Sequence, residues 1–151
     1  PWSIVLKMRK ELETMVKQIQ LEWPSLGVKV RANLMWDKAP HFCAELEKLL
    51  PFESIHGHTV ISGLNMSIPM KLMWLEREYD APRKPGRLFI YTNGQRIVIP
   101  YGLTTEPGDV NCFADVVEED LPLLEKAGLA CKYRFMTGDC EPQTVIVSAA
   151  E

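Results

Sequence analysis

The feature that most constrains the fold is the stretch RLFIYTNGQRIVIPYG, residues 87–102. Two runs rich in β-branched and aromatic residues flank Asn93-Gly94. This pair suits a type I′ turn, because both central positions of that turn need positive φ. The stretch therefore predicts an antiparallel β-hairpin.

Several other short segments share this strand-like character. In residues 28–37 apolar and polar side chains alternate, which is typical of a half-buried strand. Gly57 interrupts one of the other segments and indicates a bend or bulge there. The intervening loops are expected at residues 77–86 and 103–111, and the further strands at residues 53–63, 65–70, 112–119, 131–136 and 144–150.

Three helices are expected. The first covers residues 3–23 and carries an apolar stripe at three- and four-residue spacing, which is made by Ile4, Met8, Leu12, Met15 and Ile19. The second follows Asp37 and ends at Pro51, and the third is a short helix at residues 119–128 that ends at Gly128. The stripe of the first helix suits packing on the protein's own body or on a partner, and the sequence leaves both open.

Many short strands with few helices favour a mainly β fold, a closed antiparallel barrel whose ends are covered by helices. We divide the chain into an N-terminal amphipathic helix and linker at residues 1–27 and a barrel domain at residues 28–151.

Composition excludes some classes of function. The formal net charge is -3 and the basic residues form no block, so no nucleic-acid partner is expected. No apolar run approaches the ~20 residues that span a bilayer and no signal-peptide layout is present, so no membrane partner is expected. The cysteines form no C-x-x-C pair, which argues against a zinc ribbon and favours reduced thiols in a cytoplasmic protein: Cys43, Cys112, Cys131 and Cys140.

Several motifs, taken in order, resemble a bacterial cyclophilin-like domain family of unknown function. They are DKAPHFCAELEKLLPF (residues 37–52), a strand that begins IHGH (from residue 55), the stretch from REYDAP to IPYG (residues 77–102) and PGDVNCFADVVE (residues 107–118). The resemblance covers most of residues 28–136. It implies an eight-stranded cyclophilin-like β-barrel capped by two helices.

The same resemblance bears on activity. Prolyl isomerases of the cyclophilin type carry FHR on the strand after the first barrel helix, and their arginine stabilises the twisting amide. This chain has Ile55-His56-Gly57 there, and glycine supplies no such hydrogen bonds. The resemblance therefore implies a module without isomerase activity.

His56 and His58 would share one face of an extended strand. Two such imidazoles can chelate zinc or nickel if Cys112 and Asp109 lie beside His56 and supply the third and fourth donors, but a hydrogen-bonded wall residue is the simpler interpretation, and no metal or cofactor is expected. Cys112 could serve as a nucleophile if His56 activates it, although packing in the core explains it as well.

The loop before residue 112 carries polar groups suited to a barrel mouth. Together with apolar side chains expected nearby, which include Trp74, they could form a small ligand pocket. With both histidines, the candidate ligand-binding residues are His56, His58, Met70, Tyr101, Thr104, Asp109, Asn111 and Phe113.

Two functions follow as hypotheses. The first is a binding module for a small carbonyl-containing or anionic metabolite, or the small subunit of a metabolic enzyme, in which the N-terminal helix contacts a second copy or a larger subunit. The alternative is an enzyme, either a divergent prolyl isomerase or a small-molecule lyase or hydrolase that uses His56. No catalytic residue is assigned.

Overall fold

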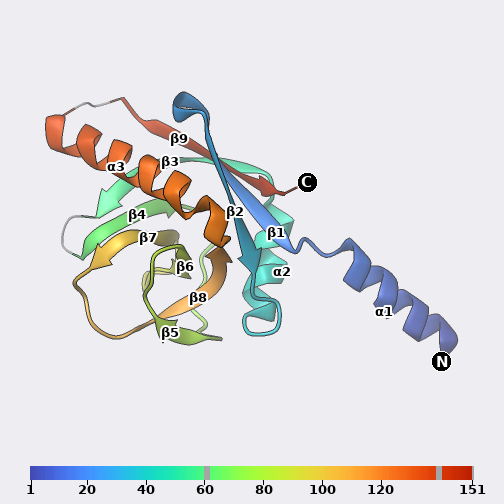
Figure 1. The fold of residues 1–151 in the computed structure, drawn as a ribbon. Helices are drawn as coiled ribbons and strands as arrows, with labels where there is room; N and C mark the ends of the chain where they lie inside the picture. Colours follow the sequence, from blue (N-terminus) through green and yellow to red (C-terminus); the bar gives the residue numbers. More distant parts are fainter. Residues whose placement is uncertain (60–61, 139–140, 151) are drawn as a thin grey trace.

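The computed structural model describes residues 1–59, 62–138 and 141–150. A closed antiparallel β-barrel forms its body, and a separate helix projects from it (Figure 1). The order of strands around the barrel is β2-β1-β9-β3-β4-β7-β6-β8, and pairing of β8 with β2 closes the ring. The predicted mainly β fold with an eight-stranded closed barrel is therefore confirmed.

The strands are short, and each pairs with neighbours that run in the opposite direction. A ninth, three-residue strand, β5 (Asp80–Pro82), adds to β8 outside the ring. The barrel strands are β1 (Gln18–Trp23), β2 (Val28–Leu34), β3 (Phe52–Thr59), β4 (Gly63–Pro69), β6 (Arg87–Ile90), β7 (Arg96–Thr104), β8 (Asp109–Val116) and β9 (Gln143–Ala149).

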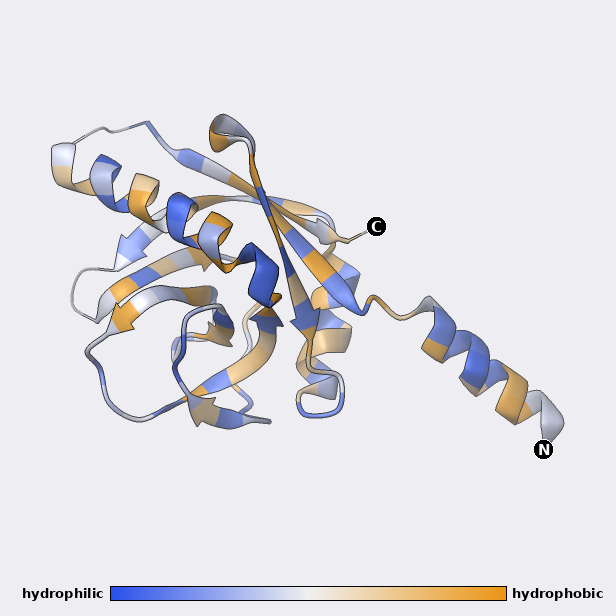
Figure 2. Ribbon diagram, in the orientation of Figure 1, coloured by the Kyte–Doolittle hydropathy of each residue, from blue (hydrophilic) through white to orange (hydrophobic). Residues whose placement is uncertain are grey.

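The inner face of the wall forms the main core. Met66 of β4 pairs with Ile99 of β7, and Ile68 pairs with Ile97, and all four side chains are fully buried. Successive side chains of a strand point to opposite sides, so the residues between them face outward. The wall thus has an apolar inner face and a separate outer face, and hydrophobic and hydrophilic residues are interspersed along its strands (Figure 2).

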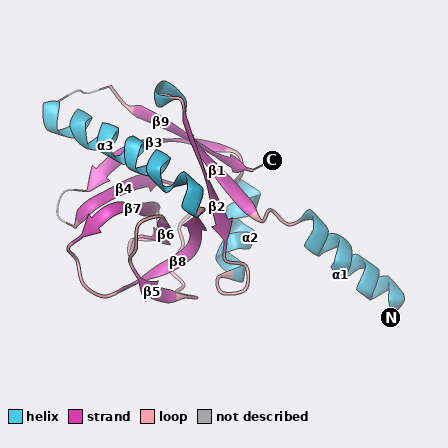
Figure 3. Cartoon of the chain, viewed as in Figure 1, coloured by secondary structure: helices cyan, strands magenta, loops and turns pink. Residues whose placement is uncertain are grey.

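Three α-helices accompany the barrel (Figure 3). Helix α2 (Pro40–Leu49) packs on the core through Phe42, Cys43 and Leu46. Helix α3 (Leu121–Thr137) lies across one end of the barrel, where it contacts β2, β3 and β7. Helix α1 (Trp2–Thr14) has no buried residue and projects away from the barrel. None of the helices in the described residues is long and apolar enough to cross a membrane.

The predicted first helix is too long. It ends at Thr14, and Gln18–Trp23 forms β1, which pairs with β2 and β9. The apolar spacing of three and four residues continues through Ile19, but burial in this segment alternates with a period of two. Pairing with two neighbouring strands therefore outweighed the helical pattern.

The predicted end of the last helix at Gly128 is also wrong. Helix α3 continues to Thr137 and ends at Gly138, whose φ is 71°. The predicted strand at residues 131–136 is part of this helix. A Cβ added to Gly128 would lie 2.4 Å from ring carbons of Tyr101, so this glycine lets the helix backbone lie against the aromatic ring.

The hairpin of β6 and β7 is confirmed, but the type I′ turn is not present. Among the described residues only glycines have positive φ, so Asn93 lacks the required conformation, and Gly94 has φ 76°. A Cβ on Gly94 would lie 2.4 Å from the carbonyl oxygen of Trp74. Close approach of the 71–79 segment therefore accounts for this glycine.

Candidate functional site

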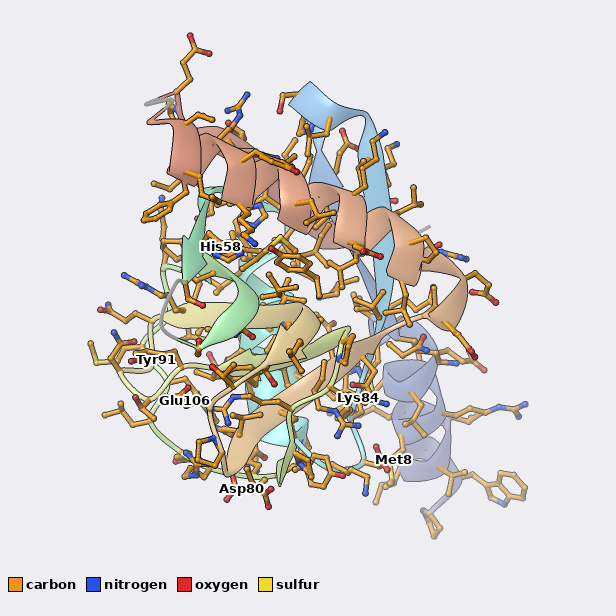
Figure 4. The ribbon with its side chains drawn as sticks, turned by 60° about the vertical axis from the view of Figure 1, so that its left-hand side comes forward. Met8, His58, Asp80, Lys84, Tyr91 and Glu106 are labelled. Carbon is orange, nitrogen blue, oxygen red and sulfur yellow. The ribbon has the colours of Figure 1, made fainter. Side chains whose placement is uncertain are left out.

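A cleft of about 290 Å³ opens on the outer face of the wall. Tyr91 and Glu106 lie on the same side of the barrel, with His58 nearer to α3 (Figure 4). We call this site the outer cleft. Its lining residues are His58, Thr59, Ser62, Ser67, Tyr91, Arg96, Val98 and Glu106.

Strand register explains why these residues meet. Ser67 of β4 pairs with Val98 of β7 and with Gly57 of β3. Paired residues share a face of the sheet, so Ser67 and Val98 lie side by side on the outer wall. Arg96, two residues before Val98, lies on the same face of β7.

The floor of the outer cleft combines an apolar surface with one hydroxyl that has no hydrogen-bond partner in the described part of the chain. Val98 is buried and belongs to a small apolar cluster on the outer face, together with Phe89 and Cys112. Ser67 is also buried, and its hydroxyl makes no hydrogen bond within the described part of the chain. Gly57, which pairs with Ser67, has no side chain, and the space where its Cβ would lie is free of other atoms within 4 Å.

Arg96 gives the outer cleft a positive charge. Its side chain is exposed at the start of β7, and its guanidinium forms no ion pair or hydrogen bond with the residues that the structure describes. The backbone N–H of Tyr91 donates to the carbonyl of Arg96 at 2.9 Å, which places the phenol ring on the adjacent strand end. A cation and an aromatic ring therefore both border the outer cleft.

Glu106 comes from the loop between β7 and β8, and Arg83 holds this loop in place. The guanidinium of Arg83 donates to the carbonyls of Glu106, Pro107 and Gly108 at 2.9–3.2 Å. It also pairs with Oε2 of Glu106 at 3.0 Å. The loop is therefore positioned by one largely buried arginine.

His58 borders the outer cleft, but its ring points inward. Its Nε2 lies 2.7 Å from the hydroxyl of Tyr101. Burial lowers the pKa of His58, the backbone of Thr59 opposes this effect, and Lys132 lowers the pKa further. Burial also raises the pKa of Tyr101 to about 12. Both partners of this contact are therefore favoured in their neutral forms at pH 7.

His56 lies on the same inner face of β3, more deeply buried. The indole N–H of Trp23 donates to its Nδ1, and its Nε2 has no partner among the described residues. Burial, together with His58, lowers its pKa to about 3. Gln143, which pairs with it across β3 and β9, is 2% exposed and its amide also lacks partners in the described residues.

The two histidines thus share one face, as expected. His56 faces the core, and His58 borders the outer cleft with its ring directed to Tyr101. Among the described residues no group of three or more His, Cys, Asp or Glu side chains is placed to hold a metal ion. His56 has no contact with the outer cleft, so the geometry offers it no role toward a ligand bound there.

The other candidate residues do not converge on one pocket. Met70 and Phe113 are buried in the main core, where Phe113 packs on Phe42 with ring centroids 4.5 Å apart. The amide of Asn111 donates to the carbonyl of Glu76 at 2.8 Å and so fixes a loop. Thr104 ends β7 and Asp109 begins β8, on either side of the loop that carries Glu106.

The described cysteines are buried, and burial raises the pKa of each thiol. It raises the pKa of Cys43 to about 12 and the pKa values of Cys112 and Cys131 to about 11. A thiol with a raised pKa is a poor nucleophile at neutral pH. Cys140 lies outside the described residues.

Sequence reasoning missed most of the outer cleft. Ser67 lies within β4, Tyr91 directly follows β6, Arg96 begins β7 and Glu106 lies in a loop. Tyr91 and Arg96 belong to the predicted hairpin, but nothing in its pattern marked them as ligand-binding residues. One signal was available. Arg96 and Val98 alternate with Ile97 and Ile99 in the predicted hairpin, so a core position for the two isoleucines places Arg96 and Val98 on the outer face.

Comparisons with known proteins agree with the fold. No protein-family model matches the chain, and no curated protein matches it. The solved structure of McbB in complex with tryptophan superposes with a TM-score of 0.77 and 28% identity over 86% of this chain. That match covers 44% of the McbB chain, so this chain spans less than half of its length.

The solution structure of the hypothetical protein AF2241 from Archaeoglobus fulgidus is a second match. It superposes with a TM-score of 0.60 and 16% identity, over 90% of this chain and 96% of its own. At this identity the likeness shows the fold alone.

Proposed function

We propose that this chain binds a small organic molecule with a carboxylate and an apolar body in the outer cleft. The observation that carries the proposal is Arg96, a guanidinium without a partner in the described residues, beside Tyr91 and buried Val98. Arginine donors match the geometry of a carboxylate. Small-molecule sites are typically concave, apolar and supplied with a few polar groups.

The ligand of the McbB structure supports this class of molecule. Tryptophan has a carboxylate and a large apolar ring, and McbB is 28% identical to this chain over the matched part. An anionic metabolite is one of the two ligand classes predicted from the sequence, beside a carbonyl-containing one. The cyclophilin-like assignment and the absence of isomerase activity remain part of the proposal.

A titration with indolepropionate, followed by heteronuclear NMR of the full chain, tests it. Shift changes should gather at Thr59, Ser67, Tyr91 and Val98, and Arg96→Gln should weaken binding about tenfold or more, because a hydrogen bond to a charged group is worth about 1.5–3 kcal/mol. Changes confined to the barrel interior, or binding unaffected by Arg96→Gln, would contradict the proposal.

We also propose that α1 pairs with the α1 of a second copy of the chain in antiparallel orientation. Its apolar side chains are exposed, from 54% for Val5 to 80% for Trp2. Ile4, Met8 and Leu12 are spaced four residues apart, so a twofold axis at Met8 would place Ile4 of one copy opposite Leu12 of the other.

The charges of α1 favour the same arrangement. Its first turn has no acidic residue, and no side chain caps its N-terminus. An antiparallel partner would bring its own Glu13 close to that end, where the helix dipole favours negative charge. A larger enzyme subunit in place of the second copy is the alternative occupant.

A further inference from the structure

Two opposite charges line the outer cleft. Arg96 lies on the wall, and Glu106 lies on the loop at the rim. Oε2 of Glu106 accepts from Arg83 at 3.0 Å, whereas no interaction of its Oε1 is formed with the described residues. Each of the two side chains therefore keeps a charged group that is available to a ligand.

The two groups select different ligand charges. A guanidinium has five N–H donors and no acceptor, so it binds carboxylates and rejects ammonium groups. A carboxylate oxygen accepts from an ammonium group. A molecule that satisfies both within one cleft of about 290 Å³ carries a carboxylate and an ammonium on a small frame, as an α-amino acid does.

The rest of the outer cleft suits the side chain of such a molecule. The ring of Tyr91, 44% exposed, and buried Val98 supply apolar surface, and the Ser67 hydroxyl supplies one polar atom on the floor. Aromatic pairs in offset or edge-to-face geometry add to the apolar burial. The volume of about 290 Å³ is at the small end of the range for ligand sites and suits one molecule of this size.

We infer that the ligand of the outer cleft is an aromatic α-amino acid in its zwitterionic form. Arg96 binds the carboxylate, the free oxygen of Glu106 binds the ammonium, and Tyr91 and Val98 contact the aromatic ring. This inference rests on the proposed carboxylate-binding function and adds a second charge and a ring to it.

Three probes separate the two charges while keeping the indole ring constant. L-Tryptophan has both charges, indolepropionate lacks the ammonium, and tryptamine lacks the carboxylate. Calorimetry on the full chain should give the tightest binding for tryptophan, with the other two about tenfold or more weaker, since each loses one charged hydrogen bond.

Variants assign each charge to its residue. Arg96→Gln should weaken tryptophan and indolepropionate while leaving tryptamine unchanged. Glu106→Gln should weaken tryptophan and tryptamine while leaving indolepropionate unchanged or tighter. Lys126→Gln, which removes an exposed charge on α3, is the matched control and should change none of the three.

The outcomes also separate this inference from the proposed function. If indolepropionate binds as tightly as tryptophan and its binding is still weakened by Arg96→Gln, the inference of a zwitterionic ligand is wrong, but the proposed carboxylate site stands. Equal binding of all three probes would overturn both charge assignments. Failure of every probe to bind would overturn the proposed function as well. Far-ultraviolet circular dichroism of each variant confirms that it is folded.

Discussion

The indole N–H of Trp23 donates to Nδ1 of His56, 33 residues away in the sequence, and so decides which nitrogen of His56 carries the proton. Because Nδ1 accepts, the neutral ring must be protonated on Nε2. The contact links β1 to β3 inside the barrel. Burial of the ring, together with His58, makes His56 a group that resists protonation.

The burial of His56 predicts acid sensitivity. The pKa of His56 is lowered to about 3 in the folded state, against 6.5 for an unperturbed histidine, which represents the unfolded chain. The unfolded state therefore binds the proton first, so the stability contribution is complete above about pH 6.5 and decreases as the pH falls. The loss should be about 1.4 kcal/mol per pH unit, or about 2 kcal/mol at pH 5.

Urea unfolding at pH 7 and pH 5 measures this loss. The lowered pKa of His58 acts in the same direction. In His56→Gln, whose amide oxygen can still accept from Trp23, most of the loss between these pH values should disappear. Equal pH dependence in the wild type and in His56→Gln would show that His56 is accessible to protons in the folded state.

Gly128→Ala should destabilise the protein, although alanine is the better helix former. Its Cβ would lie 2.4 Å from the Tyr101 ring, and overpacking of this kind costs about 1–3 kcal/mol. Thermal or urea unfolding measures the change. Gly57→Ala is the matched control, because its Cβ meets nothing within 4 Å, and it should cost clearly less. A stabilised Gly128→Ala would mean that α3 is not held against Tyr101.

Arg83→Gln should loosen the rim of the outer cleft. It removes the hydrogen bonds to three consecutive carbonyls and the ion pair with Glu106. Hydrogen exchange at residues 104–109 should accelerate, because the loop loses these bonds. Tryptophan binding should weaken, because part of the binding energy is then needed to order the loop.

Arg77→Gln is the control for this change. It removes an exposed ion pair with Asp80, at 2.6 Å, and such pairs contribute about 0–1 kcal/mol. Exchange at residues 104–109 should be the same as in the wild type. Unchanged exchange in Arg83→Gln as well would show that the loop is ordered by other contacts.

Cysteine cross-linking tests the antiparallel pairing of α1. A mixture of Ile4→Cys and Leu12→Cys chains should form a mixed disulfide under mild oxidation, and each variant alone should form little. Parallel pairing would give the reverse result. Met8→Glu should convert the dimer to a monomer in light scattering, because it places two like charges on the twofold axis, whereas Lys10→Gln should not. A wild-type monomer would leave a larger subunit as the occupant of α1.

The barrel could be predicted because many local signals agreed. The hairpin of residues 87–102, the strand from residue 28 and the helix after Asp37 each follow from side-chain periodicity. The wrong predictions of helix ends and strands arose where tertiary contacts determine the secondary structure. Gly128 ends a helix by propensity, but contact with Tyr101 places it inside one. Residues 18–23 continue a helical spacing, yet pair with two strands.

The outer cleft was harder to predict than the fold. Thr59, Ser67 and Arg96 become neighbours only through the register of β3, β4 and β7, which the sequence alone does not specify. Glu106 depends on Arg83, 23 residues earlier. His56 and His58 were candidates because of their residue type, but their side of β3 faces the core.

The wall that carries the outer cleft is a single layer of backbone, and this has a consequence for how such a protein can diverge. Along β3 the residues that face the core, His56 and His58, alternate with Gly57 and Thr59, which face outward. Replacements at the outward positions alter which ligand the outer cleft prefers without changing the side chains that pack in the barrel core. One scaffold can therefore acquire new ligand preferences by single substitutions while its folding remains unchanged.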